Sequence, residues 1–368
     1  MPKASLTFGI LARFVLVAFF LSAGIPLRSQ EWDLSHLPDY VPDQKVSGTI
    51  RNFGFAMNGL LEAWEKGFAR HHPGVKFEDR LPTSDAAVAG LVCEIADLGV
   101  SGREPMLTEL EAFYDTFGSE MQTITVATGT YDVRTTWSVA IFVNKANPLA
   151  QLTMKQLDRI FGASRTGGYE GFRFVSDHAR SGKEDIRTWG QLGLKGEWAD
   201  KPIQTYGYAF TGQAQFFQQQ VFHGGDKWNP NYREYVESGS KMLKDDPAGR
   251  ALGINAMLTE LSADKYGIGW TGIRQGAGFP DVKVVALAAR DGGPFVAPSA
   301  SSVQSRQYPL TRSIYLFLKH PTGTALDARL REFLRYILSR EGQELVAQNR
   351  KYLPLTAEVA LEQRSKLD

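Results

Sequence analysis

The stretch SVAIFVNKANPLAQLTMKQLDRIFG, residues 138–162, contains the pattern of a buried strand, a turn and a helix start in immediate succession. Residues 139–143 are continuously apolar, which is typical of a strand covered on both faces. Turn-forming residues at 144–148 interrupt that run. Thr153 and Gln156 have the spacing of a capping box, which predicts a helix to the end of the stretch. We therefore expect a buried strand to leave one body of the protein and a helix to begin another.

Taken from the residues alone, this stretch also fits one more strand–helix unit of a single domain. Its Val-Asn-Lys, Asn-Pro-Leu and Leu-Thr-x-x-Gln-Leu elements, however, resemble the crossover of the phosphate-type periplasmic solute-binding proteins, the extracytoplasmic receptors of ABC importers. Further segments resemble that family in collinear order over roughly residues 46–356: ADLGVSGREP at 96–105, IRTWGQLGLKGEWADKPI at 186–203, YGIGWTG at 266–272 and YPLTRSIYLF at 308–317.

The resemblance implies a fold of the α/β class, the two-lobed type II periplasmic-binding-protein fold. Each lobe would hold a central mixed sheet flanked by helices, and two crossover hinge strands would join the lobes. We expect residues 46–140 together with 286–356 to form a discontinuous lobe one, and residues 141–285 to form lobe two.

Composition and charge fit an ordinary globular protein of about two domains. The chain has 368 residues, of which 43% are hydrophobic, and its 41 Lys and Arg residues against 40 Asp and Glu residues leave a formal charge of +1. A nucleic-acid partner would require a clustered basic face, which this balance does not indicate. We therefore expect no nucleic-acid partner.

The N-terminus has the form of a secretory signal over approximately residues 1–30. Basic Lys3 and Arg13 precede an apolar run at 14–21 and the small residues at 22–24. An uncleaved anchor is the alternative, but the apolar run is short for a membrane span. We expect a periplasmic or secreted protein that is soluble after signal removal, with residues 31–45 as a polar leader of the mature chain.

The chain has a single cysteine, Cys93, so it has no lipobox cysteine at the end of the signal and no intrachain disulfide. Cys93 lies among Leu91, Val92 and Ile95, and we predict a buried structural thiol there. The paired His71 and His72 lack further ligands in a metal-binding pattern, so structure alone accounts for them, and we expect no metal and no cofactor.

Ligands of open α/β sheets lie beyond the carboxyl ends of strands, where helix N-termini favour anions. The resemblance implies four such loops, three from lobe one and one from lobe two. The residues that it assigns to the ligand are Phe55 and Ala56 in the first loop, Thr83 and Ser84 in the second, Ser101 and Arg103 in the third, and Thr211, Gly212 and Gln213 in the fourth.

This chain departs from the family pattern at two of these loops. Phe55, Ala56 and Met57 stand where the family has hydroxyl residues, no arginine occurs in residues 207–210, and Gln213 stands where the family has threonine. Arg103 has two interpretations: a fork that binds the anion, or a salt bridge with Glu104 or Glu109. Compensating arginines would be Arg51, Arg134 or Arg274.

The main hypothesis is a monomeric, non-enzymatic receptor that captures phosphate or a related small oxyanion in the cleft between its lobes for the membrane subunits of an ABC importer. A second hypothesis is a degenerate site for another small polar solute, lined by Phe55, Met57, Tyr206, Tyr208 and Phe210. A ligand sensor or scaffold is a third. A phosphoester hydrolase is not favoured, because the sequence has no nucleophile elbow, zinc-protease motif or P-loop, and its six histidines are scattered.

Overall fold

The computed structural model describes residues 32–129, 138–209, 212–235, 254–321 and 323–368. Contacts divide the chain into the units Met1–Asp33 and Leu34–Asp368. The predicted signal segment therefore lies outside the described residues. Among the described residues, no helix is long and apolar enough to cross a membrane.

The first of two large sheets has five strands in the order β2-β1-β3-β13-β4. Strands β1, β2 and β3 are parallel, whereas β13 runs antiparallel to both β3 and β4. The strands are β1 (Ser47–Gly54), β2 (Gly74–Arg80), β3 (Leu98–Ser101), β4 (Gln122–Thr128) and β13 (Ser313–Leu318). Its helices are η1 (Met57–Gly59), α1 (Leu60–His71), α2 (Ala86–Val92), α3 (Leu107–Phe117), α9 (Ala328–Ile337), α10 (Arg340–Asn349), α11 (Ala357–Arg364) and η6 (Ser365–Leu367).

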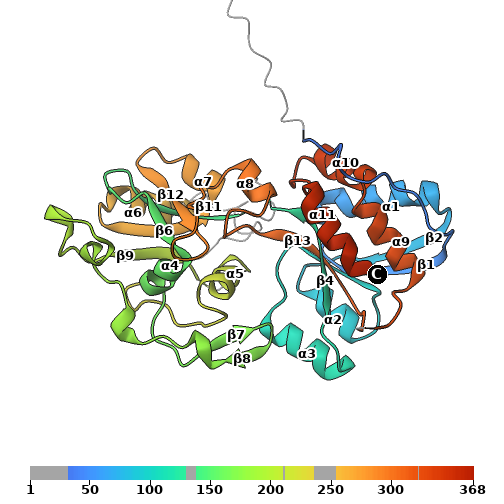
Figure 1. The fold of residues 1–368 in the computed structure, drawn as a ribbon, viewed down its shortest axis with the longest axis horizontal. Helices are drawn as coiled ribbons and strands as arrows, with labels where there is room; N and C mark the ends of the chain where they lie inside the picture. Colours follow the sequence, from blue (N-terminus) through green and yellow to red (C-terminus); the bar gives the residue numbers. More distant parts are fainter. Residues whose placement is uncertain (1–31, 130–137, 210–211, 236–253, 322) are drawn as a thin grey trace, which may run out of the picture. The chain divides into compact units, whose positions relative to one another are not determined.

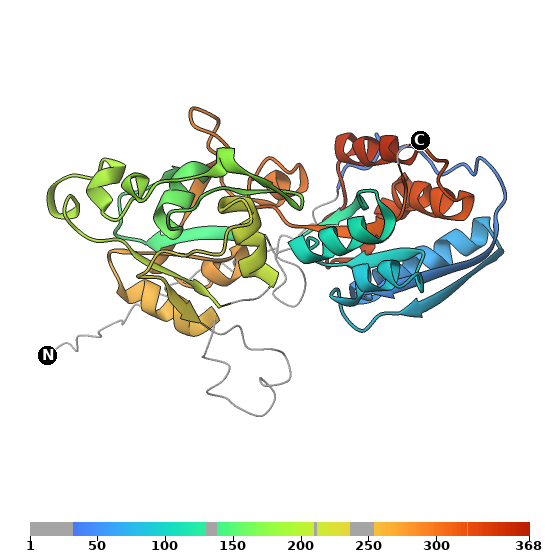
Figure 2. The same ribbon diagram turned by 90° about the horizontal axis from the view of Figure 1, so that it is seen from below.

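The second sheet has six strands in the order β10-β9-β11-β5-β12-β6. They are β5 (Val139–Asn144), β6 (Gln151–Thr153), β9 (Gln204–Tyr208), β10 (Arg233–Tyr235), β11 (Gly267–Gly272) and β12 (Val282–Ala288). Its helices are α4 (Met154–Phe161), α5 (Gly212–Val221), α6 (Ile254–Ala263), α7 (Ile273–Ala277) and α8 (Ala300–Gln304). A small hairpin, β7 (Gly168–Glu170) and β8 (Arg173–Val175), and the short helices η2 (Ser176–His178), η3 (Gly182–Glu184), η4 (Trp189–Leu192) and η5 (Gly196–Trp198) complete this part. Figures 1 and 2 show each sheet with its own flanking helices, the two-lobed α/β fold that the resemblance implies.

The strand and helix predicted around the crossover are confirmed. Strand β5 pairs antiparallel with β11 on one side and β12 on the other, and residues 139–143 are buried. The Gln156 N–H donates to the Thr153 hydroxyl at 3.2 Å, while the Thr153 N–H donates to Gln156 Oε1 at 2.9 Å. This capping box fixes the start of α4, whose Leu157 is fully buried against the second lobe.

The predicted polar leader is wrong in one respect, because its apolar residues pack on the first lobe. Leu34, Leu37 and Tyr40 are buried. The Tyr40 hydroxyl donates to Glu332 at 2.8 Å and lies 2.6 Å from His72 Nε2. The segment before β1 is therefore part of the folded core rather than a loose leader.

The prediction of a buried Cys93 is also wrong: the thiol is exposed. Helix α2 ends at Val92, so Cys93 caps it and does not continue its apolar face. The neighbouring Ile95 is likewise exposed. The apolar surroundings of Cys93 in the sequence are real, but the chain turns away from the core at this point.

A half-buried carboxyl group links α1 to the first two strands. The Asn52 amide, which is 1% exposed, donates to Glu65 Oε1 at 2.9 Å and to Asp79 Oδ1 at 3.0 Å. Burial, followed by the negative charge of Asp79, raises the pKa of Glu65 from 4.5 to about 8. Glu65 is thus protonated in the folded protein at neutral pH.

Glu65→Gln is expected to remove a pH dependence of stability. Between about pH 4.5 and 8 the folded state holds a proton that the unfolded state releases, so the free energy of unfolding of the wild type falls as pH rises through that window. The glutamine variant lacks this loss, which amounts to a few kcal/mol at about 1.4 kcal/mol per pKa unit of the shift. Urea unfolding at pH 5, 7 and 9 measures it, and parallel pH profiles of the two proteins would contradict the assignment.

Gly54 is required where β1 meets the loop that follows it. Its φ is +137°, and an added Cβ would overlap the Val100 carbonyl oxygen on neighbouring β3. Gly59 also has a positive φ, +84°, but nothing lies within 4 Å of a Cβ added there. A side chain at Gly54 would thus cause both backbone strain and a steric clash, whereas one at Gly59 would cause backbone strain alone.

We expect Gly54→Ala to lower the free energy of unfolding by about 2–4 kcal/mol, because strain and overpacking act together. Gly59→Ala, which adds strain alone, should cost about 1–2 kcal/mol. Chemical denaturation of both variants measures the difference. Equal costs for the two alanines would show that β1 and β3 can separate without penalty.

Candidate functional site

Three loops of the first lobe meet at the carboxyl ends of β1 and β3. The Phe55 N–H donates to the Val100 carbonyl at 2.9 Å, and Phe55 forms an isolated bridge with Pro82. The Gly102 N–H donates to the Ser84 hydroxyl at 3.0 Å. The structure thus brings together the first, second and third loops that the sequence predicts.

Arg103 is the most constrained side chain of this junction, and it is 7% exposed. Its Nε and Nη2 donate to Asp85 Oδ1 at 2.9 and 2.7 Å. Its Nη1 and Nη2 donate to the two oxygens of Glu109 at 2.9 and 2.7 Å, and Nη1 also donates to the Glu104 carbonyl at 2.8 Å. A guanidinium has five N–H groups, so each of them has a partner here.

The carboxylates determine the charge state of this cluster. Burial acts to lower the pKa of Arg103, but Glu109 and Asp85 raise it above its ordinary value. One positive and two negative side chains leave the cluster with a formal charge of −1. Of the two predicted interpretations of Arg103, the salt bridge with Glu109 is present, and the guanidinium is buried rather than on the surface.

The hydroxyls of the lobe-one loops differ in their surroundings. Buried Ser101 donates to the Arg103 carbonyl at 2.8 Å and accepts from the Arg103 N–H at 3.1 Å, so it shapes the third loop. Ser84 accepts from Gly102 and donates to no described residue. Exposed Thr83 lies beside Asp85, and Ala56 is exposed as well.

The fourth loop reaches the same neighbourhood through the start of α5. Arg103 Cδ lies 3.9 Å from the position of a Cβ added at Gly212, the first residue of that helix. Further along α5, Gln219 donates to the Pro105 carbonyl at 2.9 Å. Gln213 lies in the first turn, whereas Thr211 and Phe210 lie outside the described residues.

Two aromatic residues assigned to an alternative, more apolar pocket are instead core residues, so that part of the second hypothesis is wrong. Tyr206 and Tyr208 are 2% and 1% exposed. The Tyr206 hydroxyl donates to Asp264, and the Tyr208 hydroxyl lies 2.8 Å from the Thr271 hydroxyl. Strand β9 buries both rings because it lies between β10 and β11. Met57 is also fully buried.

Of the three predicted compensating arginines, the two that the structure describes do not join the loops. Arg51 pairs with Asp97 at 2.7 Å, Arg274 is exposed on α7, and Arg134 lies outside the described residues. The arginine that does approach is Arg312, which is 3% exposed, bonds Glu104 at 3.2 Å and lies 5.3 Å over the ring of Phe216 in α5.

Sequence reasoning missed Asp85 and Arg312 as parts of this junction. Asp85 precedes α2 and has the form of an N-cap, but its side chain caps nothing and bonds Arg103 instead. Arg312 was visible only as part of the Tyr-Pro-Leu-x-Arg segment. Within the described ranges, no group of three or more His, Cys, Asp or Glu side chains is arranged to hold a metal ion.

Comparisons with known proteins agree with this architecture. Residues 51–341 match the PBP superfamily domain. The chain is 31% identical over 353 residues to the phosphate-binding protein PstS of two Pseudomonas aeruginosa strains, covering 95% of this chain and 97% of each relative. The crystal structure of PstS from Borrelia burgdorferi, 13% identical, superposes with a TM-score of 0.52 over 85% of this chain and 100% of that one. An ABC-type phosphate transport receptor from Vibrio cholerae, 17% identical, gives 0.47 over 83% and 99%. The chain therefore belongs to the PBP superfamily and, within it, to the PstS family.

Proposed function

We propose that this protein is an exported receptor that captures inorganic phosphate or a closely related oxyanion and presents it to the membrane subunits of an ABC importer. The observation that carries the proposal is the meeting of three predicted loops of the first lobe, with Gly212 at the start of α5 close to Arg103, in a chain that aligns with PstS of Pseudomonas aeruginosa over nearly its whole length. Binding and release, without a chemical step, is the proposed activity. The working form is proposed to be a soluble monomer in the periplasm.

The loops supply the kind of donors that a desolvated anion needs. Helix α5 begins at this junction, and a helix N-terminus offers N–H groups and a positive dipole end. The Ser84 hydroxyl has its hydrogen available, since it donates to no described residue. Thr211 and Gly212 are proposed to add donors from the second lobe, which would make the bound anion a bridge between the lobes.

Asp85 occupies the edge of the Arg103 guanidinium that would bind an anion. Its side chain is 65% exposed, yet it accepts from both Nε and Nη2 of the guanidinium. An oxyanion that binds Arg103 has to displace this carboxylate, whereas Glu109 can keep holding the opposite edge. We propose that Asp85 occupies the fork in the unliganded protein and yields it to phosphate.

Inorganic phosphate is expected to stabilise the folded protein. The measurement is thermal unfolding of the exported form, stripped of phosphate, with and without millimolar phosphate. A ligand at about 100 times its dissociation constant adds roughly 2.7 kcal/mol to stability, which raises the unfolding midpoint by several degrees. Thr211→Val should abolish most of this shift, because it removes a proposed hydroxyl donor at little change in volume.

Thr116→Val is the matched control for that variant, since Thr116 lies exposed on α3 and its hydroxyl bonds only the helix backbone at Ala112 among the described residues. It should retain the full phosphate shift. Sulfate in place of phosphate tests the selectivity for the anion. The proposal fails if phosphate shifts the wild type no more than an equal concentration of chloride.

Asp85→Asn is expected to bind phosphate at least about fivefold more tightly, which corresponds to roughly 1 kcal/mol. The change removes a negative charge beside the anion and weakens the bond that competes for the Arg103 fork. Isothermal titration at low ionic strength measures the affinity. Asp115→Asn, which changes an exposed carboxylate on the outer helix α3, is the control. An unchanged or weaker affinity for Asp85→Asn would mean that Arg103 is purely structural or that Asp85 itself holds the ligand.

A further inference from the structure

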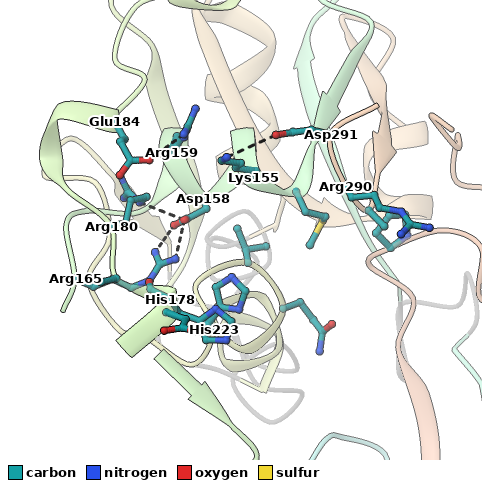
Figure 3. A pocket seen from close by; sticks show the side chains of 17 residues that line it. Lys155, Asp158, Arg159, Arg165, His178, Arg180, Glu184, His223, Arg290 and Asp291 are labelled. Atoms are coloured by element: carbon teal, nitrogen blue, oxygen red, sulfur yellow. Dashed lines mark hydrogen bonds and ion pairs between the residues drawn. The ribbon is translucent and has the colours of Figure 1, made fainter. Parts of the chain in front are cut away.

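A cavity of about 590 Å³ lies in the second lobe and is lined by none of the nine residues assigned to the phosphate loops. Its wall comes from α4, from the loop at 177–180, from the end of α5 at Gln220 and Val221, and from the turn that follows β12. Figure 3 shows the charged side chains that surround it. Because the fourth phosphate loop lies at the start of α5, the cavity belongs to the other end of that helix.

Size separates this cavity from a phosphate site. Small-molecule sites occupy roughly 300–1,000 Å³, and a cavity in this range leaves an inorganic tetrahedral ion with unfilled space and few contacts. Apolar atoms of Met154, Val221 and Pro309 form part of the wall. The cavity thus offers surface for an organic body as well as for a charged group.

The charged side chains of the wall fall into two groups: those in close ion pairs with one another and those without such a partner. Five basic residues face four acidic ones: Lys155, Arg159, Arg165, Arg180 and Arg290 against Asp158, Asp177, Glu184 and Asp291. Both oxygens of buried Asp158 are bonded by Arg165, at 2.5 and 2.8 Å, and Arg180 Nε lies 3.2 Å away. Glu184 accepts from Arg159 at 2.9 Å. These pairs are structural.

Two cations on the wall have no comparable partner. Among the described residues, Lys155 Nζ is paired only with Asp291 at 3.7 Å, and both side chains of this pair are more than half exposed. Exposed Arg290 forms no ion pair or side-chain hydrogen bond with any described residue. They come from separate segments, α4 and the turn after β12, and both line the cavity. Two basic side chains without a strong acidic partner favour an anionic ligand, since each can donate hydrogen bonds to carboxylate or phosphate oxygens.

The opposite side of the cavity presents two stacked imidazole rings. The rings of His178 and His223 stack with centroids 3.9 Å apart and planes 9° apart. Burial, together with the nearby His178 and Arg165, lowers the pKa of His223, so this imidazole is neutral at neutral pH. Figure 3 shows the pair across the cavity from Lys155 and Asp291.

We propose that this cavity is a second binding site, for a small organic anion that carries a phosphate ester or carboxylate group. Lys155 and Arg290 bind the anionic group, and the organic part lies against the apolar wall and the stacked imidazoles. The site is independent of the phosphate loops, so both ligands can be bound together.

Isothermal titration of the full chain, saturated with inorganic phosphate throughout, tests the site with two probes. AMP represents organic phosphate esters and citrate represents organic polycarboxylates. At least one probe is expected to bind with one-to-one stoichiometry at submillimolar concentration. Arg290→Ala and Lys155→Ala should each weaken that binding at least tenfold, and both variants should fold normally because the side chains are exposed.

Arg173→Ala is the matched control, because Arg173 is exposed on β8 and its one ion pair within the described part of the chain is with exposed Glu120. It should bind the probes as the wild type does, and all three variants should show the wild-type thermal response to inorganic phosphate alone. Failure of both probes to bind up to 5 mM overturns the proposal. So does probe binding that survives both Arg290→Ala and Lys155→Ala, or that disappears equally in Arg173→Ala.

Discussion

The burial of one guanidinium organises the binding face of the first lobe. A charge that is 93% buried is tolerated only when it is paired and all its donors are satisfied, and Arg103 meets both conditions through Asp85, Glu109 and the Glu104 carbonyl. Asp85 lies just before α2, Glu104 lies in the loop after β3, and Glu109 lies in α3. The guanidinium therefore fixes the relative positions of two loops and a helix, which neither propensity nor local turn chemistry can do.

Backbone contacts explain why the first loop keeps its shape although Phe55 and Ala56 stand where the family pattern has hydroxyl residues. Phe55 is held by its backbone, which donates to Val100, and Gly54 permits that approach because it has no side chain. The first loop thus contributes main-chain geometry, and its side chains are less constrained. Because the Phe55 N–H is bonded to Val100, this residue offers no free main-chain donor to an oxyanion in place of the lost hydroxyl.

Local patterns predicted individual strands and helices well, because they depend on neighbours in the sequence, whereas the two-lobed fold was predicted from the family resemblance. The capping box at Thr153 and the buried strand at 139–143 are confirmed, since each follows from periodicity and hydrogen bonding within a few residues. The errors arise where the outcome depends on distant residues. Cys93 is exposed because α2 ends at Val92, before the apolar run that extends to Ile95 is complete. Tyr206 and Tyr208 are buried because β9 lies inside its sheet, which no local pattern could reveal.

In the candidate site too, local features were predicted and contacts between distant residues were not. The sequence, read with its family resemblance, located the loops, and three of them meet in the structure. It could not identify Asp85 as the partner of Arg103, because the two are far apart in the chain and Asp85 has the form of an ordinary helix cap. The roles of Thr211 and Gln213 stay predictions. Where a charged pair is part buried and part exposed, its function depends on which partner can leave. In this pair Arg103 is buried and Asp85 is 65% exposed, so Asp85 is the group that an incoming anion can replace.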